Sequence, residues 1–471
     1  MTPEEFRRHG HQLVDWLADY LDRVKDHPVQ PVTRPGEVKA LLPLEPPEEA
    51  EPFESIVADL DRVITPHLTY WRHPRFFGYF PANSLPAGAL ADLVSTGLGV
   101  LGLSWQASPA LTEVEEVVVD WFRALVGLSS AWSGVINDTA STSTLVALIC
   151  ARERASNYGL FTRGLQAESA PLVVYASDSS HSSVEKAVLL AGFGKRHLRL
   201  VTCDDAFAMR ADRLAALIAE DRARGLRPCA VVATVGSTAT TALDPIAAIG
   251  DIARAENLWL HVDAAMAGSA MIVPECRWMW SGVEAADSLV INPHKWLGVP
   301  FDCSLQYVRD EAHLLKVMST NPSYLRSAAD GVVRNLRDTS IPLGRRFRAL
   351  KLWFCLREQG AKALRARVRR DLANAQVLAR LVAGASHWRV IAPVVLQTVC
   401  IRHEPPGLPE SEIDAHNRAW AEQLNRSGEA FVSAAQIGGH WMVRVSIGSL
   451  DTEWPDIERA WAAMRRAAEA T

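Results

Sequence analysis

Short apolar runs alternate with amphipathic segments through the middle of the chain. The apolar runs include PLVVYAS (171–177), CAVVATVG (229–236), LWLHVDAA (258–265) and SLVINPHK (288–295). Segments with helical spacing, such as TLVALICARERA and DPIAAIGDIARAE, separate them. Strands that are apolar on both faces and alternate with helices indicate a mostly parallel sheet with helices on both faces. We therefore predict a large α/β domain over residues 86–345.

The two ends of the chain have different patterns. Residues 3–25 carry apolar side chains three and four positions apart, which predicts a helix, and a connector rich in proline and acidic residues follows. This part has too few apolar residues to form a core alone, so we predict a helical arm over 1–85. From residue 346 a long helix leads to two alternating strands and a closing helix. That order predicts a small α+β domain over 346–471.

The bulk composition narrows the classes of function. Of the 471 residues, 48% are hydrophobic and 22% charged, which is typical of a globular protein with two or more lobes. A net charge of −5 gives no general attraction to nucleic acid or to an anionic membrane, so neither is expected as a partner. The sequence has neither a secretory signal nor an apolar run of the roughly 18 residues that a membrane helix needs.

The cysteines and the short motifs exclude further classes. The seven cysteines are scattered and never form a C-x-x-C pair, which favours reduced thiols in a cytoplasm over a disulfide scaffold or a zinc ribbon. The motif H-E-x-x-H is absent, and we expect no metal. GLGVLG (97–102) matches a dinucleotide fingerprint, but it neither follows a clear strand nor opens a helix, so we reject it.

Ionisable residues follow three of the predicted strands. LWLHVDAA contains Asp263, SLVINPHK ends in Lys295, and PLVVYASDSSH leads to His181. In open α/β sheets, reactive groups lie just beyond the carboxyl ends of the strands. One such residue could be a cap or a rim ion pair, but three at one edge favour a site.

Lys295 has an unusual setting because Trp296 and Leu297 follow it directly. A free lysine has a pKa of about 10.4 and is a poor nucleophile at neutral pH. Apolar surroundings favour the neutral amine, which can form a Schiff base with an aldehyde. We therefore expect an aldehyde cofactor.

Pyridoxal 5′-phosphate makes three further demands, and each has a candidate residue. Asp263 can keep the ring nitrogen protonated, and His181 can stack on the ring. The phosphate needs hydroxyls and backbone N–H groups at a helix start, and the segment DTASTSTLVALICA supplies them. The donors predicted for the phosphate are Thr139, Ser141, Thr142 and Ser143, with Thr238 and Asn292 as additions. Taken alone, the Ser/Thr run could be a plain helix cap, and His181 could be a partly buried histidine with satisfied hydrogen bonds.

Several longer motifs, in order along nearly the whole chain, strengthen this interpretation. They are WRHPRFFGYFP, GLSWQASPALTEVEE, HSSVEKA, HVDAAMAGSA, NPHKWLG and IPLGRRFRALKLWF. With them the chain closely resembles the group II pyridoxal-phosphate decarboxylases, and within these the bacterial aromatic-L-amino-acid decarboxylases. The resemblance implies PLP fold type I, the aspartate-aminotransferase-like fold. It also implies a homodimer with active sites at the interface and an N-terminal arm that wraps the partner.

The resemblance also implies residue roles. Lys295 corresponds to the Schiff-base lysine, Asp263 to the pyridinium partner and His181 to the stacking histidine. Tyr324, in NPSYL, matches the mobile-loop tyrosine that protonates the substrate carbon. The other cofactor positions are Thr139, Ala140, Ser141, Thr238, Ala265, Asn292 and His294. The positions around the substrate ring are Trp71, Tyr79, Phe80, Leu101 and Leu103.

The sequence also bears on the choice of substrate and product. Ala82-Asn83, Leu103 and Met266 stand where animal relatives often have other residues, which leaves the preferred aromatic amino acid open. Relatives that make aromatic aldehydes often have Phe or Asn in place of Tyr324 or His181, so having both favours simple decarboxylation. The alternatives are a decarboxylase of glutamate, cysteine sulfinate or histidine, an aldehyde synthase, a cofactor-free Schiff-base lyase, and a non-catalytic binding protein. An acidic substrate calls for an arginine, whereas the implied ring positions are apolar.

Overall fold

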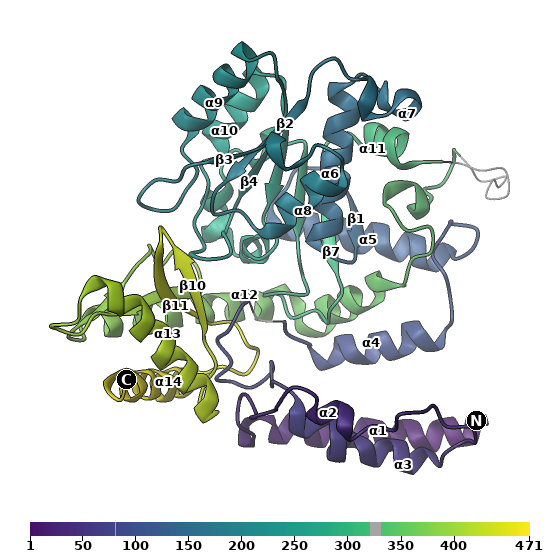
Figure 1. Cartoon of the computed structure of the whole chain (residues 1–471). Coiled ribbons are helices and arrows are strands. Elements are labelled where there is room, and N and C mark those ends of the chain that lie inside the picture. Colours follow the sequence, from purple (N-terminus) through teal and green to yellow (C-terminus); the bar gives the residue numbers. More distant parts are fainter. Residues whose placement is uncertain (81, 321–330) are drawn as a thin grey trace. The chain divides into compact units, whose positions relative to one another are not determined.

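A computed structural model describes residues 1–80, 82–320 and 331–471 (Figure 1). The chain divides into two compact units. The large unit contains residues 82–376 and 392–399, and the small unit contains 1–81, 377–391 and 400–471. The small unit thus combines the N-terminal segment with most of the C-terminal part. The three-part division with boundaries at 85/86 and 345/346 stays a prediction.

The large unit contains a seven-stranded sheet. Its strands are β1 (Ser133–Asn137), β2 (Leu172–Ser177), β3 (Leu198–Val201), β4 (Arg227–Thr234), β5 (Trp259–Asp263), β6 (Ser288–Ile291) and β7 (Ser304–Val308). They lie in the order β1-β7-β6-β5-β4-β2-β3. Strands β2 to β6 are parallel to one another, whereas β7 is antiparallel to both β1 and β6. Strand β1 therefore runs in the same direction as β2 to β6, and the prediction of a mostly parallel sheet is confirmed.

Helices cover both faces of this sheet. The helices of the large unit are α4 (Pro86–Gly97), α5 (Pro109–Val126), α6 (Ala140–Ala155), α7 (Leu160–Arg163), α8 (Ser182–Leu190), α9 (Ala211–Ala223), α10 (Ile246–Ala255), α11 (Glu311–Met318) and the start of α12 (Arg348–Ala383). Helices α6 and α8 pack together on one face, and α9 and α10 pack together on the other (Figure 1). Right-handed crossovers produce this division, because the chain moves one way along the sheet through β2 and β3 and then returns through β4 and β5.

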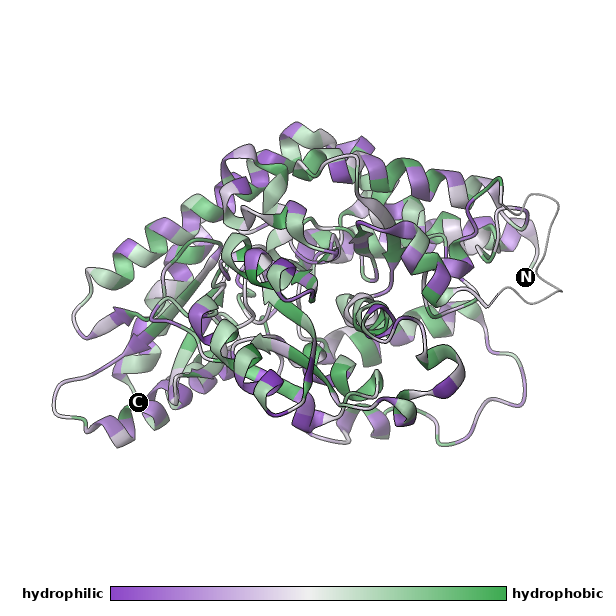
Figure 2. Cartoon of the chain, turned by 90° about the horizontal axis from the view of Figure 1, so that it is seen from above, coloured by the Kyte–Doolittle hydropathy of each residue, from purple (hydrophilic) through white to green (hydrophobic). Residues whose placement is uncertain are grey.

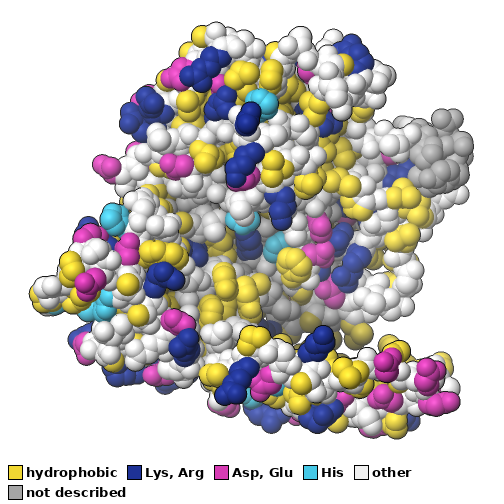
Figure 3. Space-filling view, in the orientation of Figure 1, with side chains coloured by type: hydrophobic (Ala, Val, Ile, Leu, Met, Phe, Trp, Pro, Cys, Tyr) yellow, Lys and Arg dark blue, Asp and Glu magenta, His cyan; other side chains and the backbone are white. Residues whose placement is uncertain are grey.

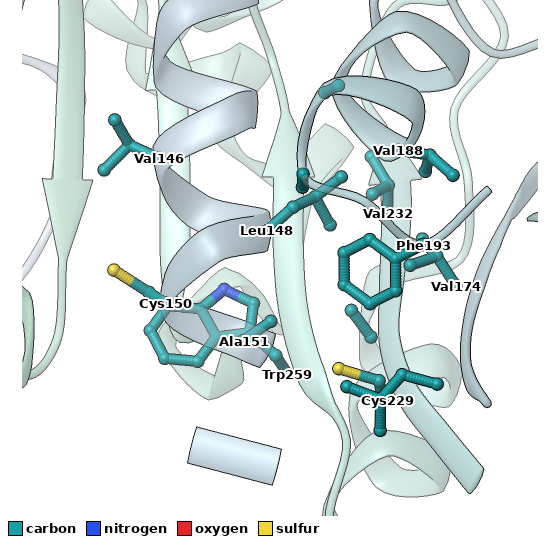
Figure 4. Close-up of a cluster of buried hydrophobic side chains, with 14 of the residues drawn as sticks. Val146, Leu148, Cys150, Ala151, Val174, Val188, Phe193, Cys229, Val232 and Trp259 are labelled. Atoms are coloured by element: carbon teal, nitrogen blue, oxygen red, sulfur yellow. The ribbon is translucent and has the colours of Figure 1, made fainter. Parts of the chain in front are cut away.

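The core between α6, α8 and the sheet is apolar (Figure 4). Val174 of β2 and Val232 of β4 are fully buried there, together with Leu148 of α6. Trp259 of β5 packs in the same cluster, and its indole nitrogen donates to the Ser288 hydroxyl at 2.8 Å. The apolar strands and the apolar side of α6 therefore account for the rigid platform under the sheet edge.

The small unit contains most of a four-stranded sheet in the order β10-β11-β9-β8, in which β10 is antiparallel to β11 and β8 is antiparallel to β9. The strands of this sheet are β8 (Trp388–Val390), β9 (Thr398–His403, of which residues 400–403 belong to the small unit), β10 (Ser433–Ile437) and β11 (His440–Ser446). Its helices are α1 (Pro3–Arg23), α2 (Glu37–Ala40), α3 (Phe53–Asp59), α13 (Glu410–Ser427) and α14 (Trp454–Glu469). The predicted first helix is present, but strands β8 and β10 were missed. Strand β10 alternates exposed and half-buried residues, and β8 is only three residues long.

Two further details differ from expectation. The long helix α12 is interrupted at Gly360, which has φ of 67° and so breaks the helix that the sequence predicted as continuous. The turn LDPIAAIG predicts Asp244 as the N-cap of the following helix, but the cap position of α10 belongs to Pro245. The buried carboxylate of Asp244 instead accepts backbone hydrogen bonds from Met209 and Thr234 at 2.7 Å each.

Exposed and buried residues are mixed along the helices. Figure 2 shows hydrophilic and hydrophobic residues following one another along them, as expected of helices with one buried side. Figure 3 shows hydrophobic side chains on the surface of the N-terminal segment, and Phe6 of α1 is 59% exposed. In the described parts of the chain, no helix combines the length and the apolar character needed to span a bilayer.

A buried ion pair connects α5 to the segment before α12. Glu115 and Arg345 are 1% exposed, and their side chains meet at 2.8 Å. Both also bind the backbone of Ile136 in β1, because Glu115 accepts from its N–H at 2.9 Å and Arg345 donates to its carbonyl. Removing either side chain leaves a buried charge and a buried backbone group without partners.

Prediction: Glu115→Ala and Arg345→Met each lower the free energy of unfolding by about 3–5 kcal/mol, the usual effect of breaking a buried ion pair. Urea unfolding followed by circular dichroism measures this. The control is Asp251→Asn, which breaks the exposed pair with Arg254 and should stay close to wild type. Equal stability of the Glu115 variant and this control would contradict the stabilising role of the Glu115–Arg345 pair.

Candidate functional site

The strands that run in one direction bring their carboxyl ends to one edge of the large sheet. Strand β1 leads into Thr139, β2 into His181, β4 into Thr238, β5 ends at Asp263, and β6 leads into Lys295. The edge therefore gathers the predicted residues of the large unit from five separate stretches of sequence.

Asp263 is the last residue of β5 and is only 5% exposed. Its Oδ1 accepts from the backbone N–H of Ala265 at 3.0 Å, which fixes the carboxylate at the strand end. Thr234 lies opposite Asp263 on β4. The Thr234 hydroxyl and the Asn292 side-chain oxygen are buried without a hydrogen-bond partner. These two atoms can form hydrogen bonds with a polar ligand bound at this edge of the sheet.

Lys295 lies in a tight turn after β6. Its backbone N–H donates to the carbonyl of Asn292 at 3.0 Å, and its own carbonyl accepts from Gly298 at 3.3 Å. The side chain is half-buried, whereas Trp296 is fully buried. The apolar surroundings inferred from the sequence are therefore present on the C-terminal side of Lys295.

His181 is the N-cap residue of α8. Its Nδ1 accepts from the backbone N–H of Ser183 at 3.1 Å and lies 2.8 Å from the Ser183 hydroxyl. The motif HSSVEKA predicts a capping box of Ser182 with Glu185, but this prediction is wrong, because the histidine ring takes the capping role and Glu185 pairs with Lys195 at 2.7 Å. Since Nδ1 accepts a backbone hydrogen bond, the proton of the neutral ring lies on Nε2.

The charges of Asp263 and Lys295 both act on the pKa of His181. Although His181 is exposed, loss of water around its ring lowers its pKa. The carboxylate of Asp263 raises that pKa and the ammonium of Lys295 lowers it further. The net shift is downward, so His181 is a neutral, flat ring at neutral pH, which suits stacking on an aromatic ring.

The start of α6 provides an anion site of the expected kind. Thr139 is the N-cap, and the exposed Ser141 lies in the first turn. The carboxylate of Asp138 accepts from the N–H of Thr139 at 2.6 Å. Burial lowers the pKa of Arg348, but its ion pair with Asp302 and the charge of Asp138 raise it. The net shift of this pKa is upward. A cation near Asp138 thus offsets the negative charge that a phosphate at this helix start meets.

Small side chains line the space between α6 and the strand ends. Ala140, Ala265 and Val290 form one buried apolar cluster, and the backbone N–H of Asn292 donates to the carbonyl of Ala265 at 2.9 Å. His294 is buried with its Nδ1 accepting from the N–H of Cys303 at 2.9 Å. Burial, followed by the charge of Lys295, lowers the pKa of His294 to about 4. Both alanines therefore leave room where a flat ring is expected.

The residues predicted to surround the substrate fall into both units. In the small unit Trp71 and Tyr79 stack at 5.3 Å, and Tyr79 is 53% exposed. The guanidinium of Arg444 lies 5.1 Å from the Phe80 ring and donates to the Tyr79 carbonyl at 3.3 Å. Arg444 was missed because a single arginine in an alternating strand gives no signal. It positions two of the predicted residues.

The remaining predicted residues lie in the large unit. Leu101 is 51% exposed, and Leu103 is half-buried. The N–H of Gly102 between them donates to the carbonyl of Arg345 at 2.9 Å. Thr238 is exposed in the turn after β4. Tyr324 lies outside the described residues.

The observed residues fit pyridoxal phosphate. The phosphate can take the N-terminus of α6, the ring nitrogen can meet the carboxylate of Asp263, and the buried atoms of Thr234 and Asn292 that lack partners are available for its polar substituents. The two alanines and His181 provide flat or small surfaces for the ring faces.

Comparisons with known proteins agree with this fit. Residues 35–404 match the model of the pyridoxal-dependent decarboxylase conserved domain. Phenylacetaldehyde synthase of Arabidopsis thaliana is 39% identical over 471 residues, which cover 98% of this chain and 95% of that protein. Aromatic-L-amino-acid decarboxylase of Bos taurus is 39% identical over 480 residues, with the same coverage.

A solved structure is also similar throughout. The crystal structure of Oryza sativa TDC with PLP and tryptamine superposes with a TM-score of 0.97 at 35% identity, covering 100% of this chain and 99% of that chain. The expected fold class, with its central sheet and small C-terminal α+β part, is thereby confirmed.

A buried histidine under Asp263 makes stability depend on pH. His261 precedes Asp263 by two residues on β5, and its ring contacts the hydroxyls of Thr144 at 3.3 Å and Ser288 at 2.8 Å. Burial lowers its pKa to about 4. The folded chain keeps this ring neutral, whereas the unfolded chain protonates it below a pH of about 6.5. Unfolding therefore takes up a proton, and stability falls as the pH decreases through this window.

Prediction: His261→Gln makes the free energy of unfolding less dependent on pH between about 6.5 and about 4, by up to ~1.4 kcal/mol per pH unit. Urea unfolding at a series of pH values measures the slope. The exposed His11→Gln variant is the control and keeps the wild-type slope. An unchanged slope in the His261 variant means that its pKa is not lowered by folding.

Proposed function

Because the chain belongs to the pyridoxal-dependent decarboxylase family, we propose that it converts aromatic L-amino acids into the corresponding amines and CO2. It is a carboxy-lyase whose cofactor is pyridoxal 5′-phosphate. The observation that carries the proposal is the gathering of Lys295, Asp263 and His181 at one sheet edge beside the start of α6. The aromatic substrate class rests on relatives named for aromatic amino acids or their products.

The residues of the large unit take the following roles. Lys295 holds the cofactor covalently through its Nζ. Asp263, fixed by Ala265, keeps the ring nitrogen protonated, and His181 stacks on the ring. Thr139, Ala140, Ser141 and the first N–H groups of α6 hold the phosphate, with Thr238, Asn292 and His294 around them. When bound, the cofactor supplies an electron sink for the electrons that CO2 leaves behind.

Substrate recognition is assigned to apolar and aromatic side chains. The set Trp71, Tyr79 and Phe80, and separately the pair Leu101 and Leu103, offer aromatic or apolar surface, which suits an aromatic ring better than a carboxylate. An acidic substrate needs a cation that is available to it, but Arg444 is only 4% exposed and is engaged by Tyr79 and Phe80. This favours an aromatic substrate over glutamate or cysteine sulfinate.

Tyr324 is proposed as the acid that returns a proton to the substrate carbon. The tyrosine that it matches in the family lies on a mobile loop, which suits this step because water has to be excluded when the carbon is protonated. The similarity to phenylacetaldehyde synthase keeps aldehyde formation as the second candidate function. The two differ in oxidation, since the second reaction consumes dioxygen and water and gives an aldehyde, ammonia and hydrogen peroxide, with the CO2, in place of the amine.

We further propose a homodimer with active sites at the interface, in the cytoplasm. The apolar side chains exposed on and after α4 support a partner surface, because a lone chain gains nothing by exposing them. They are Leu90, Leu93, Val94 and Leu98. All seven cysteines are free thiols, which supports a reducing compartment. Sedimentation of the cofactor-loaded protein at the mass of two chains is expected, and sedimentation as a monomer would contradict the dimer.

Prediction: Lys295→Ala abolishes both the visible absorbance of the bound cofactor and CO2 release from every amino acid tested. Lys186→Ala, which changes an exposed lysine of α8, is the control and keeps both. Turnover comparable to wild type without Lys295 would contradict its role. A wild-type protein without the visible band would instead favour a cofactor-free lyase or a binding protein.

Prediction: in a CO2-release panel, the wild-type enzyme acts on one or more of Dopa, tryptophan, 5-hydroxytryptophan, tyrosine and phenylalanine. Glutamate, cysteine sulfinate and histidine give no release above background, because the substrate positions are assigned to apolar and aromatic side chains, which suit neither an acidic group nor an imidazole. Chromatography of the products identifies the amine, and an aldehyde as the main product would favour the second candidate function. Release from glutamate alone would contradict the aromatic assignment.

A further inference from the structure

The part of α12 after Gly360 contacts the turn that carries Lys295. Trp296 follows Lys295 directly and is fully buried, and its Nε1 donates to Oδ2 of Asp371 at 2.8 Å. Asp371 is also fully buried. Its other oxygen accepts from Arg370 at 3.1–3.2 Å, so both carboxylate oxygens have donors.

A second contact from the same helix binds the backbone of the turn. Arg367 donates through Nη2 to the carbonyl of Trp296 at 3.3 Å and to the carbonyl of Leu297. The two carbonyls that follow Lys295 thus share one guanidinium. A cation on these carbonyls and an anion on the indole hold the same short segment from two directions.

The other side of the turn is fixed by the sheet. The N–H of Lys295 donates to the carbonyl of Asn292, whose own N–H donates to the carbonyl of Ala265 after β5. Lys295 therefore lies between a segment tied to β5 and a segment tied to α12. The hydrogen bonds to the segment after β5 were expected from the position of Lys295 at a strand end, whereas the contacts with α12 were not.

Burying a carboxylate costs free energy, so a buried aspartate needs a physical reason. Burial raises the pKa of Asp371 to about 6, against the effects of Arg370, the Trp296 hydrogen bond and Arg367. A well-packed apolar residue in this place is often at least as stable as a buried charge. Stability alone therefore gives a weak reason for an aspartate here, whereas control of the direction of Trp296 and its neighbour gives a specific one.

We propose that Asp371 and Arg367 are positioning residues that hold the turn so that Nζ of Lys295 meets the aldehyde carbon of the cofactor. The inference rests on the proposed role of Lys295. The bond forms when the neutral amine attacks the aldehyde carbon and one water leaves, giving a C=N bond with no oxidation or reduction. Small displacements of a reacting group have large effects on such a step, so a loosened turn slows both the binding of the cofactor and the return of Lys295 after each turnover.

The test measures cofactor capture in four variants. Trp296→Phe keeps the ring but removes the donor, Asp371→Asn keeps an acceptor but removes the charge, and Arg367→Lys keeps the charge but not the planar guanidinium. Arg369→Gln is the matched control, because Arg369 lies on the same helix and pairs with the exposed Glu275 at 2.5 Å. For each variant, cofactor is removed, and the rate at which the visible band returns on adding pyridoxal phosphate is recorded. The pH midpoint of that band and the melting temperature are recorded as well.

We expect Trp296→Phe and Arg367→Lys to recover the band at least about tenfold more slowly than wild type and to shift its pH midpoint. Asp371→Asn is expected to be milder, because the acceptor for Trp296 is kept. Arg369→Gln is expected to match wild type. KM for the substrate should change little, while kcat falls with the rate of band recovery.

Two results would overturn the proposal. One is recovery at the wild-type rate and pH midpoint in both Trp296→Phe and Arg367→Lys. The other is a lowered melting temperature with an unchanged band, which would mean that the contacts serve stability alone. If the wild-type protein itself shows no band, the proposed role of Lys295 fails instead, so the two failures are distinguishable.

Discussion

The common direction of β1 to β6 is the constraint on which the site depends. Parallel strands place their carboxyl ends at one edge, so residues from distant stretches of sequence, such as Thr139, Asp263 and Lys295, become neighbours without any long loop. The apolar core beneath, between α6, α8 and the strands, makes this edge rigid. Strand β7 runs in the opposite direction and is inserted between β1 and β6. The Glu115–Arg345 pair binds β1 at Ile136, just before the start of α6.

Two buried or half-buried lysines of the large unit show how surroundings set chemical roles. Lys351 is fully buried and paired with Asp92 at 3.1 Å, with Asp302 at 3.8 Å, so its charge is balanced by two carboxylates. Lys295 lies instead in a hydrogen-bonded turn between Asn292 and the buried Trp296. An ammonium held between two carboxylates is a structural element, whereas a lysine at a strand end beside Asp263 and His181 is suited to covalent chemistry.

Much of the fold could be predicted from the sequence because apolar runs and helical spacing report burial directly. The runs that contain Asp263 and Lys295 became β5 and β6, and their polar residues are at the sheet edge as expected. Strand β10 was missed because it buries neither face fully, and the break at Gly360 was missed because a single glycine in a helical pattern is often tolerated. His181 took the capping role expected of Ser182, a choice that depends on side-chain geometry.

The contacts of α12 were beyond sequence reasoning for a different reason. Arg367 and Asp371 lie in a basic amphipathic stretch whose spacing predicts only a helix with a solvated face, and nothing in that pattern links them to a turn some 70 residues earlier. Long-range partners of this kind depend on the packing of the folded chain. The same is true of Arg444, which positions Tyr79 and Phe80 from β11.

The central claim is that Lys295, among all lysines of the chain, bonds to the cofactor. The most direct test is borohydride reduction of the protein loaded with pyridoxal phosphate, followed by proteolysis and mass spectrometry of the peptides. Reduction fixes the cofactor to whichever lysine holds it. We predict that the added mass will be found on Lys295, in the peptide that contains NPHKWLG. Modification of Lys351 or another lysine in its place, or of none, would contradict it.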